Sequence, residues 1–325
     1  MRAFHSDQFV LPLPAGHSFP MSKYRLLREA AESTLPQLRV TEAPAASDGE
    51  LALAHDPAWI TAVAEGTTSA AQQREIGFPW SARMVERARR SVGATIAAAR
   101  TALFEREGVA ANLAGGTHHA YAHKGSGYCV FNDVAVAARL MQAEWHRRGH
   151  GAGRGLLRVV VIDLDVHQGN GTAAIFADDA SVFTLSLHGE KNFPFRKEAS
   201  SLDVALPDGC TDTPYLAALD DALARAWALQ AAQPPQLAFY LAGADPHEND
   251  RLGRLKLTAA GLAERDRRVL QALRERGIAA AVVMAGGYGR DLTTTVDIQR
   301  RTLELACESW QGWKTRHEPA PKCAA

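Results

Sequence analysis

The sequence predicts a single α/β domain built on a mostly parallel β-sheet. From about residue 100 onward, short apolar runs alternate with segments of helical periodicity, as they do in a series of βαβ units. Most of these runs end in glycine and polar residues that a packed core does not need. No internal repeat or linker-like change of composition interrupts the chain. We therefore expect one domain over residues 1–312 and a flexible polar tail over residues 313–325.

Each expected strand is an apolar run bounded by turn residues. The runs span residues 108–114, 157–164, 181–187, 236–242 and 278–285. The helices expected after them span residues 132–149, 172–178, 213–232, 258–276 and 293–311. In the third of these helices Thr213 is the expected cap and Pro214 the first helical residue, where a missing N–H costs nothing. Upstream, residues 81–108 form a long helical stretch, and we expect its arginines to make a solvated face.

Charge and cysteine content narrow the class of protein. The chain has 36 basic and 36 acidic residues, so no global field favours nucleic acid or an anionic membrane as a partner. Its four cysteines contain no C-x-x-C pair, which argues against a disulfide framework and a zinc knuckle. The N-terminus lacks the pattern of a signal peptide, and no apolar run is long enough for a membrane span. We expect a soluble cytoplasmic protein.

The carboxyl ends of the expected strands carry the candidate metal ligands. Ligands of open parallel sheets bind beyond these ends, so polar groups placed there converge at one edge. The stretch VVVIDLDVHQGNG places Asp163, Asp165 and His167 on one side of an extended segment, and Asp245 follows another strand. By itself, D-x-D-x-H is more simply a surface strand end or a calcium-like loop. With Asp245 added, Asp165, His167 and Asp245 make a plausible zinc site, and Asp163 is left to hold a histidine.

Two further segments supply groups that can move protons or donate hydrogen bonds. GGTHHA places His118 and His119 at a strand end, where a histidine can take a proton from water and return it to a leaving group. Tyr288 follows two glycines at another strand end, where its phenol can face a developing oxyanion. Each has a plainer alternative, an ordinary loop or core histidine pair and an aromatic packed on a turn. Together with a metal they describe hydrolysis of an unactivated carbonyl, most simply an amide.

These residues resemble those of the zinc-dependent histone deacetylase family, and within it the class IV type and its bacterial relatives. The resemblance covers roughly residues 3–312. Its most specific segments, in the family's order, are 113–140, 159–176, 183–195, 241–258 and 284–292. It implies the arginase/deacetylase fold, a single α/β domain whose mostly parallel sheet of about eight strands has helices on both faces.

The resemblance also implies a role for individual residues. Asp165, His167 and Asp245 would bind Zn²⁺, and Tyr288 would stabilise the tetrahedral intermediate. His119 would act as general base and then acid. His118, held by Asp163, would supply electrostatic support.

A structural K⁺ site and a narrow substrate channel are implied as well. The potassium site would comprise Asp163, Asp165, His167, Ser186 and Leu187. The channel residues would be Gly127, Tyr128 and Gly287, with an opposite aromatic wall from Phe193 or Phe195.

Asn170 departs from the commoner pattern of the family. Many members carry an aspartate here, directed toward the second histidine of the pair, whereas asparagine is typical of class IV-like members. An amide can hold His119 by a hydrogen bond but cannot stabilise its charged form by Coulomb attraction. We therefore expect a lower His119 pKa than an aspartate would give.

The implied function is removal of acetyl or longer acyl groups from lysine side chains of proteins or peptides. The alternatives are a deacetylase of acetylpolyamines or other small amines and, less favoured, a catalytically silent acyl-lysine binder. A two-manganese ureohydrolase needs further bridging carboxylates, which residues 241–250 do not offer. The sequence indicates no nucleic acid or membrane partner and leaves the oligomeric state open.

Overall fold

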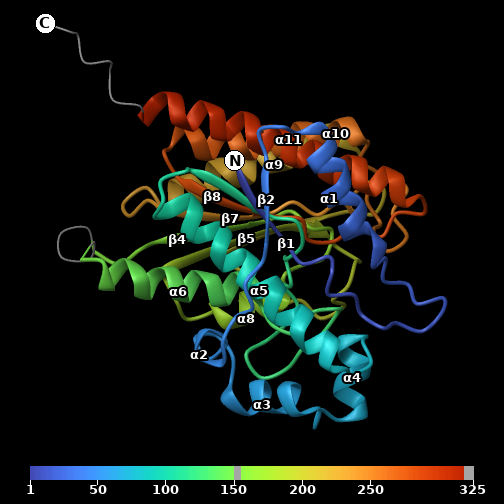
Figure 1. Cartoon of the computed structure of the whole chain (residues 1–325). Helices are drawn as coiled ribbons and strands as arrows, with labels where there is room; N and C mark the ends of the chain where they lie inside the picture. The colour runs from blue at the N-terminus through green and yellow to red at the C-terminus, as the bar shows by residue number, and fades with distance from the viewer. Residues whose placement is uncertain (150–154, 318–325) are drawn as a thin grey trace, which may run out of the picture.

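The chain folds around one eight-stranded sheet in the computed structural model, which describes residues 1–149 and 155–317 (Figure 1). The strands are β1 (Arg2–His5), β2 (Arg39–Glu42), β3 (Val109–Asn112), β4 (Val159–Asp163), β5 (Val182–Gly189), β6 (Leu202–Leu206), β7 (Leu237–Leu241) and β8 (Ala279–Val283). Their order across the sheet is β2-β1-β3-β8-β7-β4-β5-β6, and every neighbouring pair is parallel. The predicted parallel α/β class is confirmed.

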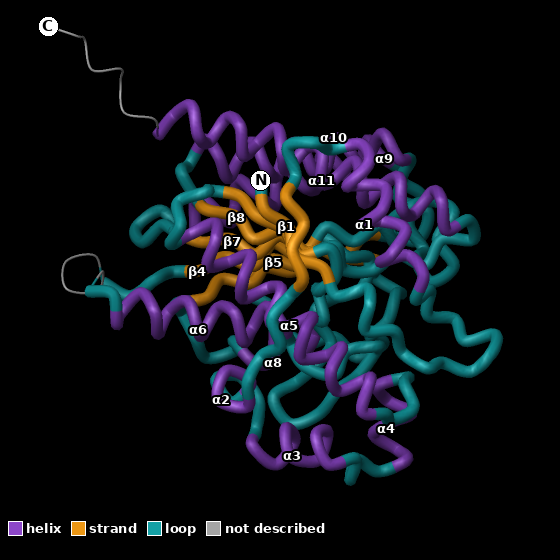
Figure 2. The backbone as a smooth tube through the Cα atoms, in the orientation of Figure 1, coloured by secondary structure: helices purple, strands orange, loops and turns teal. Residues whose placement is uncertain are grey.

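Helices cover both faces of this sheet. They are α1 (Ser22–Thr34), α2 (Asp48–Leu51), α3 (Pro57–Glu65), α4 (Ala70–Ile76), α5 (Ala82–Leu103), α6 (Asp133–Arg147), α8 (Asn170–Ile175), α9 (Asp212–Leu229), α10 (Ala259–Glu275) and α11 (Leu292–His317). Figure 2 shows α1, α9, α10 and α11 on one side of the strands and α5, α6 and α8 on the other. Side chains alternate between two cores along β4: Val159 and Val161 join the α5 and α6 side, Val160 and Ile162 the opposite side.

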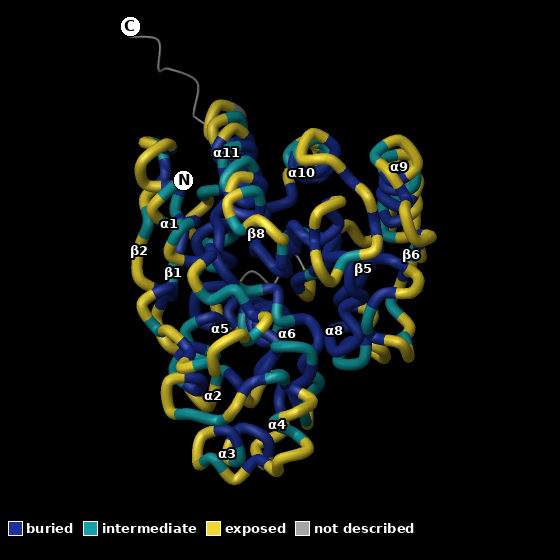
Figure 3. The backbone as a smooth tube through the Cα atoms, turned by 90° about the vertical axis from the view of Figure 1, so that its right-hand side faces the viewer, coloured by how far each residue is buried: buried dark blue, intermediate teal, exposed yellow. Residues whose placement is uncertain are grey.

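All five expected strands are present; four are slightly shorter than predicted, and β5 extends two residues further, to Gly189. The segment-by-segment prediction did not include β1, β2 and β6. Figure 3 shows β2 and β6 as the two outer strands of the sheet. An outer strand need not be uniformly apolar, and the sequences RVTE and LDVAL mix exposed charged residues with apolar ones. β1 is only four residues long, too short for a periodic signal.

Three expectations about helices need correction. Helix α9, whose first helical residue was expected to be Pro214, begins two residues earlier, at Asp212. Thr211 is its cap and Pro214 its third residue, a position whose N–H has no intrahelical acceptor in any case. The arginines of α5 do not all face solvent, because Arg87 is buried. At the C-terminus α11 continues to His317, beyond the boundary expected at residue 312, and residues 318–325 lie outside the described residues.

Among the described residues no helix is long and apolar enough to cross a membrane.

Candidate active site

Four adjacent strands, β3, β8, β7 and β4, deliver the predicted site residues to one edge of the sheet. The histidine pair follows β3, Tyr288 follows β8, Asp245 follows β7, and Asp165 and His167 follow β4. Parallel neighbours end at the same edge, which is why residues distant in sequence meet there. The pair, Asp165, His167 and Tyr288 line one cavity of about 770 Å³.

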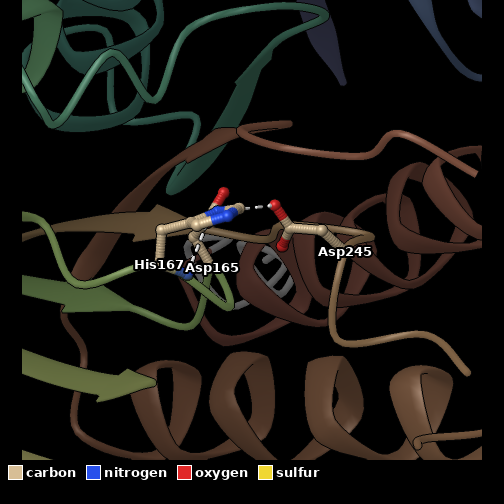
Figure 4. A group of neighbouring side chains, drawn as sticks. All are labelled: Asp165, His167 and Asp245. Atoms are coloured by element: carbon tan, nitrogen blue, oxygen red, sulfur yellow. Dashed lines mark hydrogen bonds and ion pairs between the residues drawn. The ribbon is translucent and has the colours of Figure 1, made fainter. Parts of the chain in front are cut away.

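Asp165, His167 and Asp245 form a compact buried group (Figure 4). Each offers one ligand atom, and these atoms all lie within 4.8 Å of one another. His167 Nδ1 lies 2.9 Å from Asp165 Oδ1 and 3.3 Å from Asp245 Oδ2. Two carboxylates and an imidazole are a donor set that suits zinc and leaves a position open for water or substrate.

Backbone turns, rather than strand alternation, bring Asp165 and His167 together. β4 ends at Asp163, so the expected extended segment stops before both ligands. The Asp165 N–H donates to Asp163 Oδ1 at 3.2 Å, and the His167 N–H donates to Asp165 Oδ1 at 2.9 Å. Each aspartate thus accepts a hydrogen bond from the backbone two residues ahead, which is characteristic of an Asx turn.

The two carboxylates are also held by backbone donors from neighbouring loops. Val166 N–H donates to Asp245 Oδ1 at 2.9 Å, and Gly286 N–H donates to Asp165 Oδ2 at 2.7 Å. A side chain at Gly286 would collide with both carboxylates, so only glycine lets this backbone approach. Asp245 Oδ2 is buried without a hydrogen-bond partner among the described residues. A bound cation would satisfy this oxygen.

The electrostatics of the group also favour a cation. Burial, together with the nearby Asp165 carboxylate, raises the pKa of Asp245 to about 7. Burial alone would lower the pKa of His167, but the hydrogen bond with Asp165 and the negative charges of Asp165 and Asp245 raise it to about 10. Buried carboxylates are costly unless they are paired. The residues therefore fit a metal ion such as Zn²⁺ in donor type and in charge.

The two histidines have opposite electrostatic environments although both are buried. His118 Nδ1 lies 2.6 Å from Asp163 Oδ2. Burial opposes protonation of His118, yet Asp163 and Asp165 outweigh it and raise the His118 pKa to about 9. His119 Nδ1 lies 2.7 Å from Asn170 Oδ1. Burial and the neighbouring His118 hold the His119 pKa well below its ordinary value, so His119 is neutral.

Asn170 belongs to a hydrogen-bond chain that sequence reasoning missed. Its Nδ2 donates to the Tyr121 hydroxyl at 2.9 Å, and that hydroxyl donates to Glu198 Oε1 at 3.2 Å. The Asn170 amide oxygen must then face His119, which assigns the proton to Nδ1 and leaves Nε2 able to accept one. Tyr121 and Glu198 are 77 residues apart, so nothing in the sequence indicates that they are in contact.

Tyr288 is fixed through its backbone by two charged residues that were not predicted. Its N–H donates to Asp250 Oδ2 at 2.6 Å, and its carbonyl accepts from Arg251 Nε at 2.9 Å. Burial raises the Tyr288 pKa well above its ordinary value, so the phenol stays protonated and can donate a hydrogen bond. In sequence, Asp250 and Arg251 look like an ordinary solvated loop.

The residues expected to form the channel occupy three kinds of position: the cavity wall, the cavity rim and a place outside the lining. Gly127, Tyr128 and Phe193 line the cavity, and the Phe193 ring lies 4.9 Å from the His119 ring. Phe195 also lines it but is 85% exposed, which places it at the rim. Gly287 is not among the described residues that line the cavity. A side chain at Gly287 would meet Thr295 and Ala244, and the Gly287 carbonyl accepts from Lys23 Nζ at 3.2 Å.

Of the residues expected to hold potassium, Asp163 ends β4, Asp165 and His167 follow it, and Ser186 and Leu187 lie on β5. Asp163 and Ser186 are register partners, with Leu187 next along β5. The Ser186 hydroxyl shares a hydrogen bond with His188 Nδ1 at 2.9 Å. A potassium site stays a prediction from the resemblance.

The groups gathered at this sheet edge are those of a hydrolase that cleaves amide bonds. A model of the histone deacetylase domain matches residues 17–299, and the chain belongs to this family.

Comparison with individual proteins agrees with this assignment. An uncharacterized protein of Picosynechococcus sp. is 43% identical over 292 residues, which are 89% of this chain and 92% of that protein. Histone deacetylase 2 of Arabidopsis thaliana is 34% identical over 203 residues, 62% of this chain and 49% of the plant protein, so the match spans about half of it. A crystal structure of an HDAC homolog complexed with SAHA shares the fold, with a TM-score of 0.75 at 22% identity over 94% of this chain and 83% of that one.

Proposed function

We propose that this protein is a zinc-dependent hydrolase that removes acyl groups from lysine side chains of proteins or peptides. One observation carries the proposal: a neutral histidine, a protonated tyrosine and two of the three candidate metal ligands, Asp165 and His167, border the same cavity. A silent acyl-lysine binder would have no use for a histidine whose proton is assigned by a hydrogen-bond chain.

The residues divide the work of amide hydrolysis. Asp165, His167 and Asp245 would hold Zn²⁺, which when bound lowers the pKa of water and polarises a carbonyl. His119 accepts the proton of the attacking water at Nε2 and returns it to the amine that leaves. Tyr288 donates its phenol hydrogen bond to the acyl oxygen as negative charge develops there. His118, held by Asp163, orients the neighbouring ring.

The charges around the cavity mouth favour a peptide over a polyamine. Apart from the buried Arg87 and Asp165, the charged residues that line the cavity are basic with one exception, Glu75, which pairs with the half-buried Lys124 at 2.6 Å. The basic residues are Arg74, Lys124, Lys191, Arg196 and Arg254. A polyamine carries several positive charges and needs acidic partners at such an entrance. An acyl-lysine side chain within a neutral or acidic peptide avoids this repulsion.

The proposal is tested by turnover of one lysine peptide carrying acetyl, lactyl, crotonyl or fatty-acyl groups, beside acetylpolyamines. We expect acid release that stops when the metal is chelated and returns when zinc is restored. An absence of release from every acyl peptide by the zinc-loaded protein would refute the proposal. Faster turnover of acetylpolyamines than of any peptide would replace it with the small-amine alternative.

A further inference from the structure

A buried arginine without an acidic partner lies at the inner end of the same cavity. Arg87, on α5, is 8% exposed and lines the cavity beside Ser91, one helical turn further along. Within residues 1–149 and 155–317 its guanidinium has no ion pair, and its Nε is buried without a hydrogen-bond partner. Burying a charged group in this way is costly unless a partner compensates.

The surroundings of Arg87 supply aromatic faces but no anion. Its guanidinium carbon lies 4.5 Å from the centre of the Tyr24 ring and 5.7 Å from that of Phe19. Such cation–π contacts are worth about 0.5–2 kcal/mol and leave the N–H donors unused. Leu11 and Met84 border Arg87 in a small neighbouring hollow, so that side also offers no carboxylate.

Another buried arginine shows what this chain provides when the role is purely structural. Arg265 is fully buried, forms an ion pair with Asp266 at 2.8 Å, and donates to the carbonyl of Gly243 at 2.6 Å. Asp266 is itself held by Thr302 at 2.5 Å. Arg87 lacks every element of this arrangement, although both arginines are buried on helices that cover the sheet.

The position of Arg87 relates it to the acyl group rather than to the cavity mouth. The Phe19 ring that contacts Arg87 also lies 6.3 Å from the Tyr288 ring. The Tyr24 ring contacts both Arg87 and the buried Lys23, and Lys23 Nζ is 5.3 Å from the Tyr288 ring. Phe19 and Tyr24 therefore connect Arg87 with the tyrosine that we assign to the acyl oxygen.

We infer that Arg87 and Ser91 form a carboxylate-binding subsite at the inner end of the cavity. The carboxylate is the far end of a dicarboxylic acyl group on lysine. Guanidinium N–H donors match a carboxylate in shape and charge, and Ser91 adds a hydroxyl. Hydrolysis of such an acyl group forms a C–O bond from water, breaks the C–N bond and leaves the proton of water on the amine. The inference rests on the proposed amide hydrolysis and specifies its acyl substrate.

The test compares glutaryl-lysine and valeryl-lysine in one peptide, because the two acyl chains have equal length and differ in the terminal carboxylate. The variants are Arg87→Met, which removes the charge, and Arg87→Lys, which keeps the charge without the planar donor pair. Arg83→Met is the control, because Arg83 is exposed one turn earlier on α5. If the site takes an acyl carboxylate, the wild type prefers glutaryl by about 10-fold or more in kcat/KM. Arg87→Met then prefers valeryl, and Arg83→Met behaves as wild type.

Equal rates with the two peptides in the wild type would overturn the inference, and so would an Arg87→Met protein with an unchanged acyl preference. Should Arg87→Met fail to fold, Arg87→Lys takes its place, with partial loss expected.

Calorimetric titration with glutarate separates this inference from the proposed function, because it requires no turnover. Binding that weakens in the Arg87 variants supports the subsite even if no acyl peptide is hydrolysed. Equal affinity in wild type and variants, or no binding of glutarate to the wild type, would overturn it.

Discussion

Replacing Asn170 with aspartate tests how the amide sets the proton affinity of the general base. The structure contains its own reference for this exchange. His118 has a carboxylate 2.6 Å away and a pKa raised to about 9, whereas His119 has an amide 2.7 Å away and a pKa held well below its ordinary value. A carboxylate at this distance raises a histidine pKa by about 1–3 units, which is about 1.4–4 kcal/mol of stabilisation of the imidazolium.

The direction of the effect on activity follows from the role of His119 as base. A base with a higher pKa becomes protonated, and therefore inactive, at a higher pH. In Asn170→Asp the acidic limb of the pH profile of kcat/KM should move toward neutral pH by about 1–3 units. At a pH between the acidic limb of the wild type and that of the variant, the variant loses activity that the wild type keeps.

The assay is hydrolysis of one acyl-lysine peptide from acidic to alkaline pH, with zinc content measured for each protein. Asn170→Ala is the matched control, because it removes the hydrogen-bond acceptor without adding charge. It should lower kcat by loosening the His119 tautomer and should not shift the acidic limb upward. An acidic limb in Asn170→Asp that stays in place or moves to lower pH, at unchanged zinc content, would refute the reasoning.

Three further outcomes are expected. Tyr288→Phe should lower kcat by about 10²–10³-fold with little change in KM, because the phenol acts mainly on the developing oxyanion; steady-state kinetics on a folded variant checks this, and a loss confined to KM contradicts it. Asp245→Ala should lose zinc, and metal analysis that finds one zinc per chain would exclude Asp245 as a ligand. Burial lowers the His55 pKa to about 4, so its contribution to stability is complete above the unfolded pKa near 6.5 and falls as pH drops toward 4. At pH 5 this costs about 2 kcal/mol. The free energy of unfolding, measured with urea, should therefore fall by about 2 kcal/mol more between pH 8 and pH 5 in the wild type than in His55→Gln. Equal losses in the two proteins would show that His55 does not titrate this way.

The strand positions and the metal-type ligands could be predicted because their signals are local. β4 and β7 are short runs buried on both faces, and a polar group directly after such a run is conspicuous. The outer strands β2 and β6 lack this contrast because their exposed positions carry polar residues. The turn that follows Asp163 was not predicted. An extended strand and an Asx turn both place the D-x-D-x-H side chains close together, and only the backbone hydrogen bonds distinguish these two conformations.

The sequence by itself determined the fold class, the family and the principal groups at the sheet edge: the carboxylates Asp165 and Asp245, His167, the histidine pair and Tyr288. The tertiary structure decided how those groups are supported and what surrounds them. Asn170 is oriented by Tyr121 and Glu198, and Tyr288 by Asp250 and Arg251. Arg87 shows why the sequence alone could not give these surroundings. Helical periodicity indicates which side of a helix a residue faces but not which residues the rest of the chain places against that side. In α5, Arg83 faces solvent, while Arg87 lies beneath Tyr24 and Phe19 and borders the cavity.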